Sequence, residues 1–195
     1  MDTQTFQMIL STTEQLIKEK GCQKTTLQDI MARTGLSKGA IYHYVKSKDE
    51  LFGNILKNNM EETNRNFLAA VKEAKSYSVK GPVDAIIGSY ANNATGNEIL
   101  VYLLSQQHNE QIKAILDELH QSTLTQAAEW IRYGQQHGAI SAEIDAEALA
   151  SMFVTFSYGI HMRQLIDKPD QQALLLQQLS GFMTNALKSK IPFEG

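Results

Sequence analysis

The chain has little of several features that mark particular protein classes. Its 195 residues include one cysteine and three prolines, and no stretch approaches the roughly 18 consecutive apolar residues of a membrane span. A single cysteine, Cys22, excludes an internal disulfide, and the N-terminus lacks the basic start and apolar run of a secretory signal. We therefore expect a cytoplasmic protein with no membrane partner. The content of 43% hydrophobic and 20% charged residues is typical of a globular fold and not of a disordered chain.

Patterns typical of catalytic and metal sites are also missing. The sequence contains no nucleophile with an adjacent base and no glycine-rich phosphate loop. The histidines at 108, 120, 137 and 161 are widely scattered, with no pair at positions i and i+4. We expect no catalytic residues, no metal site and no cofactor. An all-helical enzyme remains as a rival interpretation.

The formal net charge of −3 is distributed unevenly along the chain. Residues 1–50 carry a net charge of +1, whereas residues 51–195 carry −4. The window 33–48 contains four cations and no acidic residue. These cations are Arg33, Lys38, Lys46 and Lys48. The window fits either a surface that binds a nucleic-acid backbone or an ordinary solvated face, and Arg33 is better interpreted as a surface or ion-pair residue than as a base reader.

Apolar residues recur at spacings of three and four throughout the chain, which predicts an all-α fold. The first helix ends at Gly21, the second begins at Thr25 or Thr26, and Gly35 stops it. A third helix opens at Ser37. A long fourth helix then covers about 48–75, followed by helices near 82–93, 97–108, 110–137, 145–167 and 171–188. The prolines at 82, 169 and 192 fall where the helical pattern lapses, as expected for a residue that disrupts helix interiors.

The second and third helices match a helix-turn-helix motif over residues 26–45. Gly35 permits the turn between them, and Leu36 can hold that turn against the core. Gly39 and Ala40 are small, so the backbone near the start of the third helix can approach a major groove closely.

The third helix is expected to carry polar side chains toward DNA and apolar side chains toward its own domain. Ser37 and Lys38 offer a hydroxyl group and a charge where phosphates or base edges would lie. Ile41 and Val45, spaced by four, share the face that holds the helix against its domain.

Three segments carry a family resemblance: TTLQDI at 25–30, GLSKGAIY at 35–42 and KSKDEL at 46–51. With these motifs, residues 3–63 resemble the DNA-binding domain of the TetR family of bacterial transcriptional regulators. The resemblance implies an N-terminal three-helix helix-turn-helix domain at 3–63, linked by the long fourth helix to a helical ligand-binding and dimerisation domain at 64–195. It further implies a homodimer on an operator in double-stranded DNA, associated with the bacterial nucleoid.

The resemblance also assigns roles to individual residues. Thr26 and Lys48 would contact phosphates, and Tyr42 the DNA backbone. The residues expected to meet the groove are Ser37, Lys38, Gly39 and Ala40. Where the family commonly has Tyr, any residue, His and an aromatic, this chain has Tyr42, His43, Tyr44 and Val45. Either His43 or Tyr44 could make the expected phosphate contact, and Tyr42 could be ordinary packing.

Candidate residues of the C-terminal half form two sets. Pockets combine apolar walls with a few polar groups. The ligand candidates are therefore Tyr90, Tyr102, Gln106, His108, Trp130, Tyr133, Phe153 and His161. Apolar stripes on the last two helices suit a four-helix dimer interface. The interface candidates are Phe156, Ile160, Leu175, Leu179, Phe182 and Met183. The competing interpretation of both sets is burial in the monomer core.

These observations predict a repressor that releases a pseudo-palindromic operator when a small lipophilic molecule binds its C-terminal domain. The first alternative is a DNA-binding protein without such a ligand, either architectural or regulated by a partner. Release of DNA on addition of a ligand separates these two interpretations.

Overall fold

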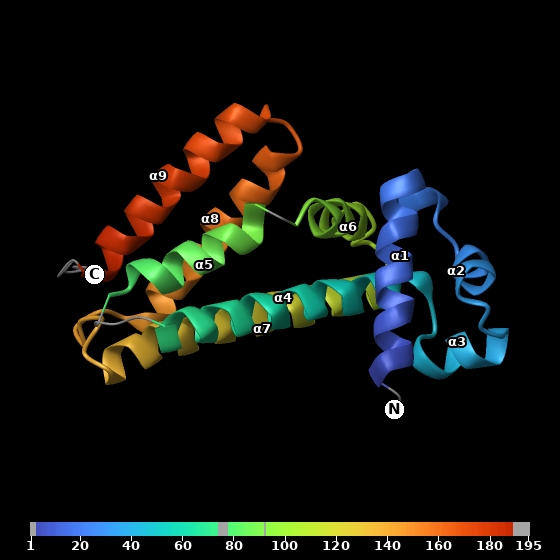
Figure 1. Ribbon diagram of the computed structural model, residues 1–195, viewed down its shortest axis with the longest axis horizontal. Helices are drawn as coiled ribbons and strands as arrows, with labels where there is room; N and C mark the ends of the chain where they lie inside the picture. The colour runs from blue at the N-terminus through green and yellow to red at the C-terminus, as the bar shows by residue number, and fades with distance from the viewer. Residues whose placement is uncertain (1–2, 74–77, 92, 189–195) are drawn as a thin grey trace. The chain divides into compact units, whose positions relative to one another are not determined.

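The computed structural model describes residues 3–73, 78–91 and 93–188, and every helix or strand assigned within these ranges is an α-helix (Figure 1). The predicted all-α class is therefore confirmed. The helices are α1 (Thr3–Lys24), α2 (Leu27–Thr34), α3 (Lys38–Tyr44), α4 (Lys48–Glu73), α5 (Lys80–Ala91), α6 (Ala94–Leu104), α7 (Glu110–Gln136), α8 (Ala146–Gln164) and α9 (Pro169–Lys188). No helix in the described part of the chain is long and apolar enough to cross a membrane.

Local sequence signals explain most of the helix boundaries. The backbone of α1 breaks at Gly21, where φ is +81°, although helical turns continue to Lys24. Pro169 is the first residue of α9, and Pro82 lies in the first turn of α5, where the missing amide hydrogen leaves no helical bond unmade. Pro192 and the predicted continuation of α4 to residue 75 lie outside the described residues.

The predicted helix 97–108 is shifted in the structure. It begins at Ala94 and ends at Leu104, and turns follow until α7 starts. Helix α7 starts at Glu110, as predicted, and Asn109 caps it, because its side-chain oxygen accepts hydrogen bonds from the backbone N–H groups of Gln111 and Ile112.

The chain forms two compact units. The N-terminal unit contains residues 1–59 and 95–119, and the C-terminal unit contains residues 60–94 and 120–195. The unit that holds α1 to α3 thus also includes α6 and the first part of α7. The division at residues 63 and 64 that the sequence suggested remains a prediction.

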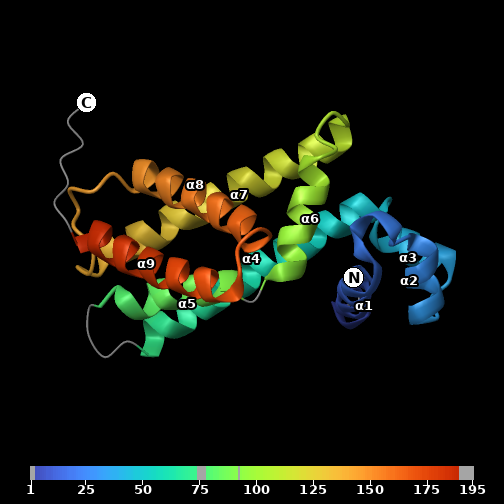
Figure 2. The same cartoon turned by 90° about the horizontal axis from the view of Figure 1, so that it is seen from above.

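The core of the N-terminal unit draws side chains from all its helices. Figures 1 and 2 show α1, α2 and α3 side by side. Ile30 of α2 and Ile41 of α3 are fully buried. They share one apolar cluster with Ile9, Ile17, Leu51, Phe52, Ile55, Ile99, Leu103 and Ile112. The buried side chains of α2 and α3 therefore belong to one core that they share with α1, α4, α6 and α7.

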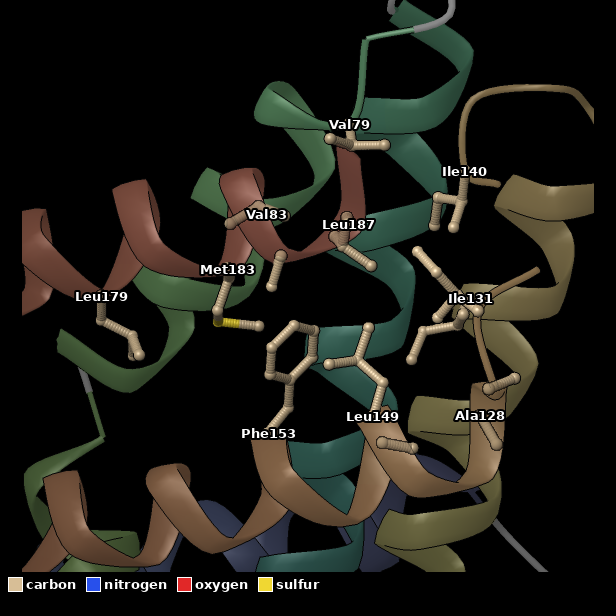
Figure 3. Close-up of a cluster of buried hydrophobic side chains, with 14 of the residues drawn as sticks. Val79, Val83, Ala128, Ile131, Ile140, Leu149, Phe153, Leu179, Met183 and Leu187 are labelled. Atoms are coloured by element: carbon tan, nitrogen blue, oxygen red, sulfur yellow. The ribbon is translucent and has the colours of Figure 1, made fainter. Parts of the chain in front are cut away.

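The core of the C-terminal unit lies among α5, α7, α8 and α9. Helices α5 and α9 run side by side in both views (Figures 1 and 2). Figure 3 shows Phe153 and Leu149 of α8 pointing toward Met183 and Leu187 of α9. Val79, Val83, Ile131 and Ile140 belong to the same apolar cluster.

Candidate nucleic-acid interface

The turn between α2 and α3 is built as the sequence predicted. Gly35 adopts the left-handed conformation, with φ of +71°, and its N–H donates to the carbonyl of Met31 at 2.9 Å. Leu36 follows and packs partly buried against the core. Ser37 caps α3 by accepting a hydrogen bond from the backbone N–H of Ala40 at 3.2 Å. These local bonds fix the direction in which α3 leaves α2.

Helix α3 has one buried face and one exposed face. Ile41 is fully buried and Val45 nearly so, which anchors the helix in the N-terminal unit. The exposed side chains belong to Ser37, Lys38, Tyr42 and His43, whereas Ala40 is partly exposed. This is the face that a DNA groove could meet.

Gly39 lies on this exposed face. A Cβ atom added at Gly39 would meet only the Ser37 hydroxyl oxygen, 4.0 Å away. The core therefore does not require glycine at this position. A close approach of DNA to α3 would explain why this position is small.

The structure distinguishes the surroundings of His43 and Tyr44. Tyr44 is partly buried and stacks on Phe6 of α1, with ring centroids 5.5 Å apart. His43 is exposed and touches Tyr44 edge-on at 5.3 Å. Tyr44 therefore serves the packing of α3 against α1, and His43 is the more accessible of the two.

Thr26 is occupied by capping α2. Its hydroxyl donates to the Asp29 carboxylate at 2.5 Å and accepts from the Asp29 backbone N–H at 3.2 Å. Lys20 contacts the same carboxylate at 2.6 Å. The Lys20 contact, helped by the Thr26 hydroxyl, lowers the pKa of Asp29 to about 2, so Asp29 stays ionised at neutral pH. The phosphate contact of Thr26 stays a prediction.

Lys48 is directed into the protein. Its ammonium group lies 3.2 Å from the carbonyl oxygen of Cys22, 3.3 Å from that of Gln23 and 3.2 Å from that of Thr25. It also lies 5.1 Å from the centre of the Tyr102 ring. A lysine ammonium has three N–H donors, and here three carbonyl oxygens lie within hydrogen-bonding distance.

The basic window contains one further engaged cation. Arg33 forms a two-pronged ion pair with Glu19 of α1, with nitrogen to oxygen distances of 2.7 and 2.8 Å. The interpretation of Arg33 as an ion-pair residue is confirmed. Lys38 is exposed and lies 5.6 Å from the centre of the Tyr42 ring, and Lys46 is also exposed. Lys38 and Lys46 are therefore the window's cations available to phosphates.

No sequence pattern indicates the role of Glu98. From α6, its carboxylate accepts a hydrogen bond from the backbone N–H of Cys22 at 3.0 Å. Burial, followed by the nearby Glu98 charge, raises the pKa of the Cys22 thiol to about 12. Cys22 is therefore a neutral, packed thiol at physiological pH and not a redox-active nucleophile.

The ligand candidates separate between the two units. Tyr102, Gln106 and His108 belong to the N-terminal unit. Tyr102 packs edge-on against Phe52, and its hydroxyl donates to Asp49 at 3.3 Å. The side-chain nitrogen of Gln106 is buried and has no hydrogen-bond partner among the described residues, and His108 is exposed. Tyr102 thus has a structural role within its own unit.

In the C-terminal unit, the structure brings Tyr90 and His161 together. Their rings meet edge-on at 5.3 Å, and the Nδ1 atom of His161 is buried with no hydrogen-bond partner in the described part of the chain. Burial lowers the pKa of His161 to about 4. Gln164 donates to the backbone carbonyl of Tyr90 at 2.9 Å. This is the one polar and aromatic cluster among the candidates that the described residues form in this unit.

The other ligand candidates of the C-terminal unit have different neighbours. Trp130 stacks on Phe67 at 4.8 Å and donates from its indole nitrogen to Asn64 at 2.8 Å. Tyr133 is exposed and stacks on His137, which directly follows the end of α7. Phe153 lies in the apolar core (Figure 3). Their assignment to a ligand site stays a prediction.

The interface candidates also divide by burial. Ile160, Leu179 and Met183 are at most 9% exposed and lie in the chain's own core, which is the alternative that the sequence left open. Leu175 packs against the same core. Phe156 and Phe182 are 41% and 46% exposed and touch edge-on, with ring centroids 5.3 Å apart. Among these candidates, the phenylalanine pair is the one available to a second chain.

Comparison with known proteins identifies the N-terminal motif. The family model described as bacterial regulatory proteins of the tetR family matches residues 9–55, which include α2 and α3. The HTH-type transcriptional regulator UidR of Escherichia coli strain K12 is 25% identical over 154 residues. That alignment covers 78% of this chain and 77% of UidR.

Solved structures share the fold over the whole chain. A putative TetR-family transcriptional regulator from Syntrophomonas wolfei has a TM-score of 0.77 and 17% identity, with 100% of both chains covered. The transcriptional regulator FadR from Bacillus subtilis, solved in complex with stearoyl-CoA, has a TM-score of 0.66 and 21% identity. That match covers 95% of this chain and 99% of FadR.

Proposed function

This chain belongs to the TetR family of bacterial transcriptional regulators, and on that premise we propose that it is a ligand-responsive repressor acting as a homodimer. The observation that carries the proposal is the exposed face of α3, which the unit's core leaves unused. Helix α3 enters the major groove. Ser37, Lys38, Gly39 and Ala40 face the base edges, and Tyr42 and His43 reach the backbone.

Two copies of the chain read two half-sites. The recognition helices of such dimers contact successive major grooves about 34–36 Å apart, so the operator is pseudo-palindromic. The exposed pair Phe156 and Phe182 supports an interface on α8 and α9, because large aromatic side chains gain most from burial against a second chain.

The ligand that releases the operator is a small lipophilic molecule bound by the C-terminal unit. The structurally similar FadR of Bacillus subtilis, solved with stearoyl-CoA, makes long-chain acyl compounds the first probes. Tyr90 and His161 are the groups suited to orient a polar end of such a molecule, because they combine aromatic surface with an unsatisfied buried nitrogen.

The test begins with selection of bound sequences from a random duplex library by the purified protein. Recovery of an inverted repeat with one-turn spacing, bound by a dimer, is the expected result. Failure to enrich any sequence contradicts the proposal. Stearoyl-CoA and free fatty acids are then titrated against the complex. A true inducer weakens operator binding, and the operator weakens inducer binding by the same factor.

Absence of any such coupling across an acyl-CoA and fatty-acid panel removes the acyl-ligand part of the proposal. The sequence-specific DNA binding then stands as the function of a regulator controlled in another way.

A further inference from the structure

The junction between α1 and α2, residues 21–26, is held by charged side chains from two other helices. Gly21 breaks the helical path of α1, and the junction's own bonds include the N–H and hydroxyl of Thr25, both donated to the Gly21 carbonyl. Lys48, from the start of α4, contacts three junction carbonyls, and Glu98, from α6, accepts from the Cys22 N–H. The junction therefore depends on partners far away in the sequence.

The Lys48 contacts use the whole of its hydrogen-bonding capacity. Its three donors match three carbonyl oxygens at 3.2 to 3.3 Å, and its charge lies at the C-terminal end of α1, where a cation is favoured. The ammonium group also lies within cation–π distance of two rings, 5.8 Å from the centre of Phe52 and 5.1 Å from that of Tyr102. A phosphate contact would have to remove Lys48 from these partners.

Glu98 holds the other side of the junction. Its oxygen lies 3.0 Å from the Cys22 nitrogen and would lie 3.3 Å from a Cβ atom at Gly21. Glu98 belongs to α6, outside the helix-turn-helix, and an acidic side chain has no attraction for DNA. Any contribution that it makes to operator binding must therefore pass through the junction.

We propose that Lys48 and Glu98 are positioning residues for operator binding, which hold the α1–α2 junction and so set the orientation of α2 and α3 relative to α1. Neither side chain touches DNA. The proposal rests on the operator binding proposed above and assigns Lys48 a role different from the phosphate contact that the resemblance implies.

Salt dependence separates the two roles of Lys48. A lysine that neutralises a phosphate contributes about one unit to the slope of log affinity against log salt concentration, and its removal makes that slope shallower. Removal of a positioning lysine lowers the affinity at every salt concentration and leaves the slope unchanged. For Glu98, the direction of the change in affinity is the test. Removing an acidic charge should strengthen DNA binding, unless the side chain is needed to hold the α1–α2 junction.

The experiment measures binding of a fluorescent selected operator by anisotropy, from low to high salt, for wild-type protein, K48M and E98A. We expect both variants to bind about tenfold more weakly with the wild-type slope. E98Q, whose amide oxygen can still accept from Cys22, restores most of the affinity. Lys46→Ala removes an exposed window cation and should make the slope shallower, whereas Lys113→Ala, a surface lysine of α7, should change neither quantity.

Circular dichroism at the assay temperature and titration of the active fraction exclude unfolding as the cause of lost affinity. If K48M does not fold, the slope of log affinity against log salt concentration is measured with K48Q, which is neutral but keeps two N–H donors. A shallower slope for the Lys48 variant, tighter binding by E98A, or unchanged affinity in both overturns the proposal. Wild-type protein that selects no operator refutes the proposed function instead.

Discussion

Replacement of Gly39 by leucine should raise the stability of the protein while destroying its operator binding. Glycine in a helix is less favourable than alanine by about 0.8–1.0 kcal/mol, and leucine is nearly as good as alanine. Apart from the chain neighbours and the backbone of α3 itself, the nearest described atom to a new Cβ is the Ser37 hydroxyl oxygen, at 4.0 Å. Gly39 is the second residue of the seven-residue α3, so the gain in unfolding free energy is at most about 1 kcal/mol.

For a chain of this size, a gain of about 1 kcal/mol raises the melting temperature by about 2–4 °C. Operator affinity should fall by about 1000-fold or more, to the level of non-specific binding, because the side chain occupies the space between α3 and the groove. Melting is followed by circular dichroism and binding by anisotropy. Gly88→Leu is the matched control, since this exposed glycine of α5 also has open space around it and should gain stability without losing affinity.

Normal operator binding by Gly39→Leu would refute the placement of α3 in the groove. A loss of stability would refute the claim that the space beside Gly39 is open.

Three further predictions concern other parts of the chain. Gly21→Ala should lower the unfolding free energy by about 2–3 kcal/mol, because the backbone angles of Gly21, φ +81° and ψ 161°, suit glycine alone. Gly35→Ala should lower it by about 1 kcal/mol, because Gly35 is in the left-handed helical region. Equal costs in denaturant titrations would contradict this difference. Phe156→Glu and Phe182→Glu should each give folded monomers in sedimentation experiments, and dimers of normal strength would place the interface elsewhere. The unfolding free energy of the wild type should fall as the pH falls from 6.5 to about 4, because buried His161 stays neutral in the folded protein while the unfolded chain takes up a proton. Above pH 6.5 the contribution of neutral His161 to the unfolding free energy is fully present. The His161→Gln variant should not lose this stability between pH 6.5 and 4. If the variant loses as much stability as the wild type over that range, His161 is not the cause.

The parts of the fold that the sequence predicted well depend on neighbouring residues. Thr26 and Asp29 form the capping pair three residues apart, and Gly35 ends α2, as expected from local rules. The division of α3 into a buried and an exposed face follows from the spacing of Ile41 and Val45 alone.

The parts that the sequence did not predict depend on distant contacts. The partners of Lys48 lie 23 to 26 residues away, and Glu98 lies 76 residues from Cys22. Helical periodicity shows which residues share a face but not which helix covers that face. For this reason Tyr102 was expected in a ligand site, although α6 places it against Phe52 in the N-terminal unit.

The pairing of cations around the recognition helix bears on how the protein searches a chromosome. In the fully described window 33–48, Arg33 and Lys48 are engaged within the protein, which leaves Lys38 and Lys46 for the backbone of DNA. Affinity for unrelated sequences grows with the number of phosphates neutralised, so this window holds the protein only weakly on them. We expect short sliding excursions and frequent hops between DNA segments. Little of the protein is then sequestered on unrelated sequence, and operator occupancy follows the cellular concentration of the regulator closely.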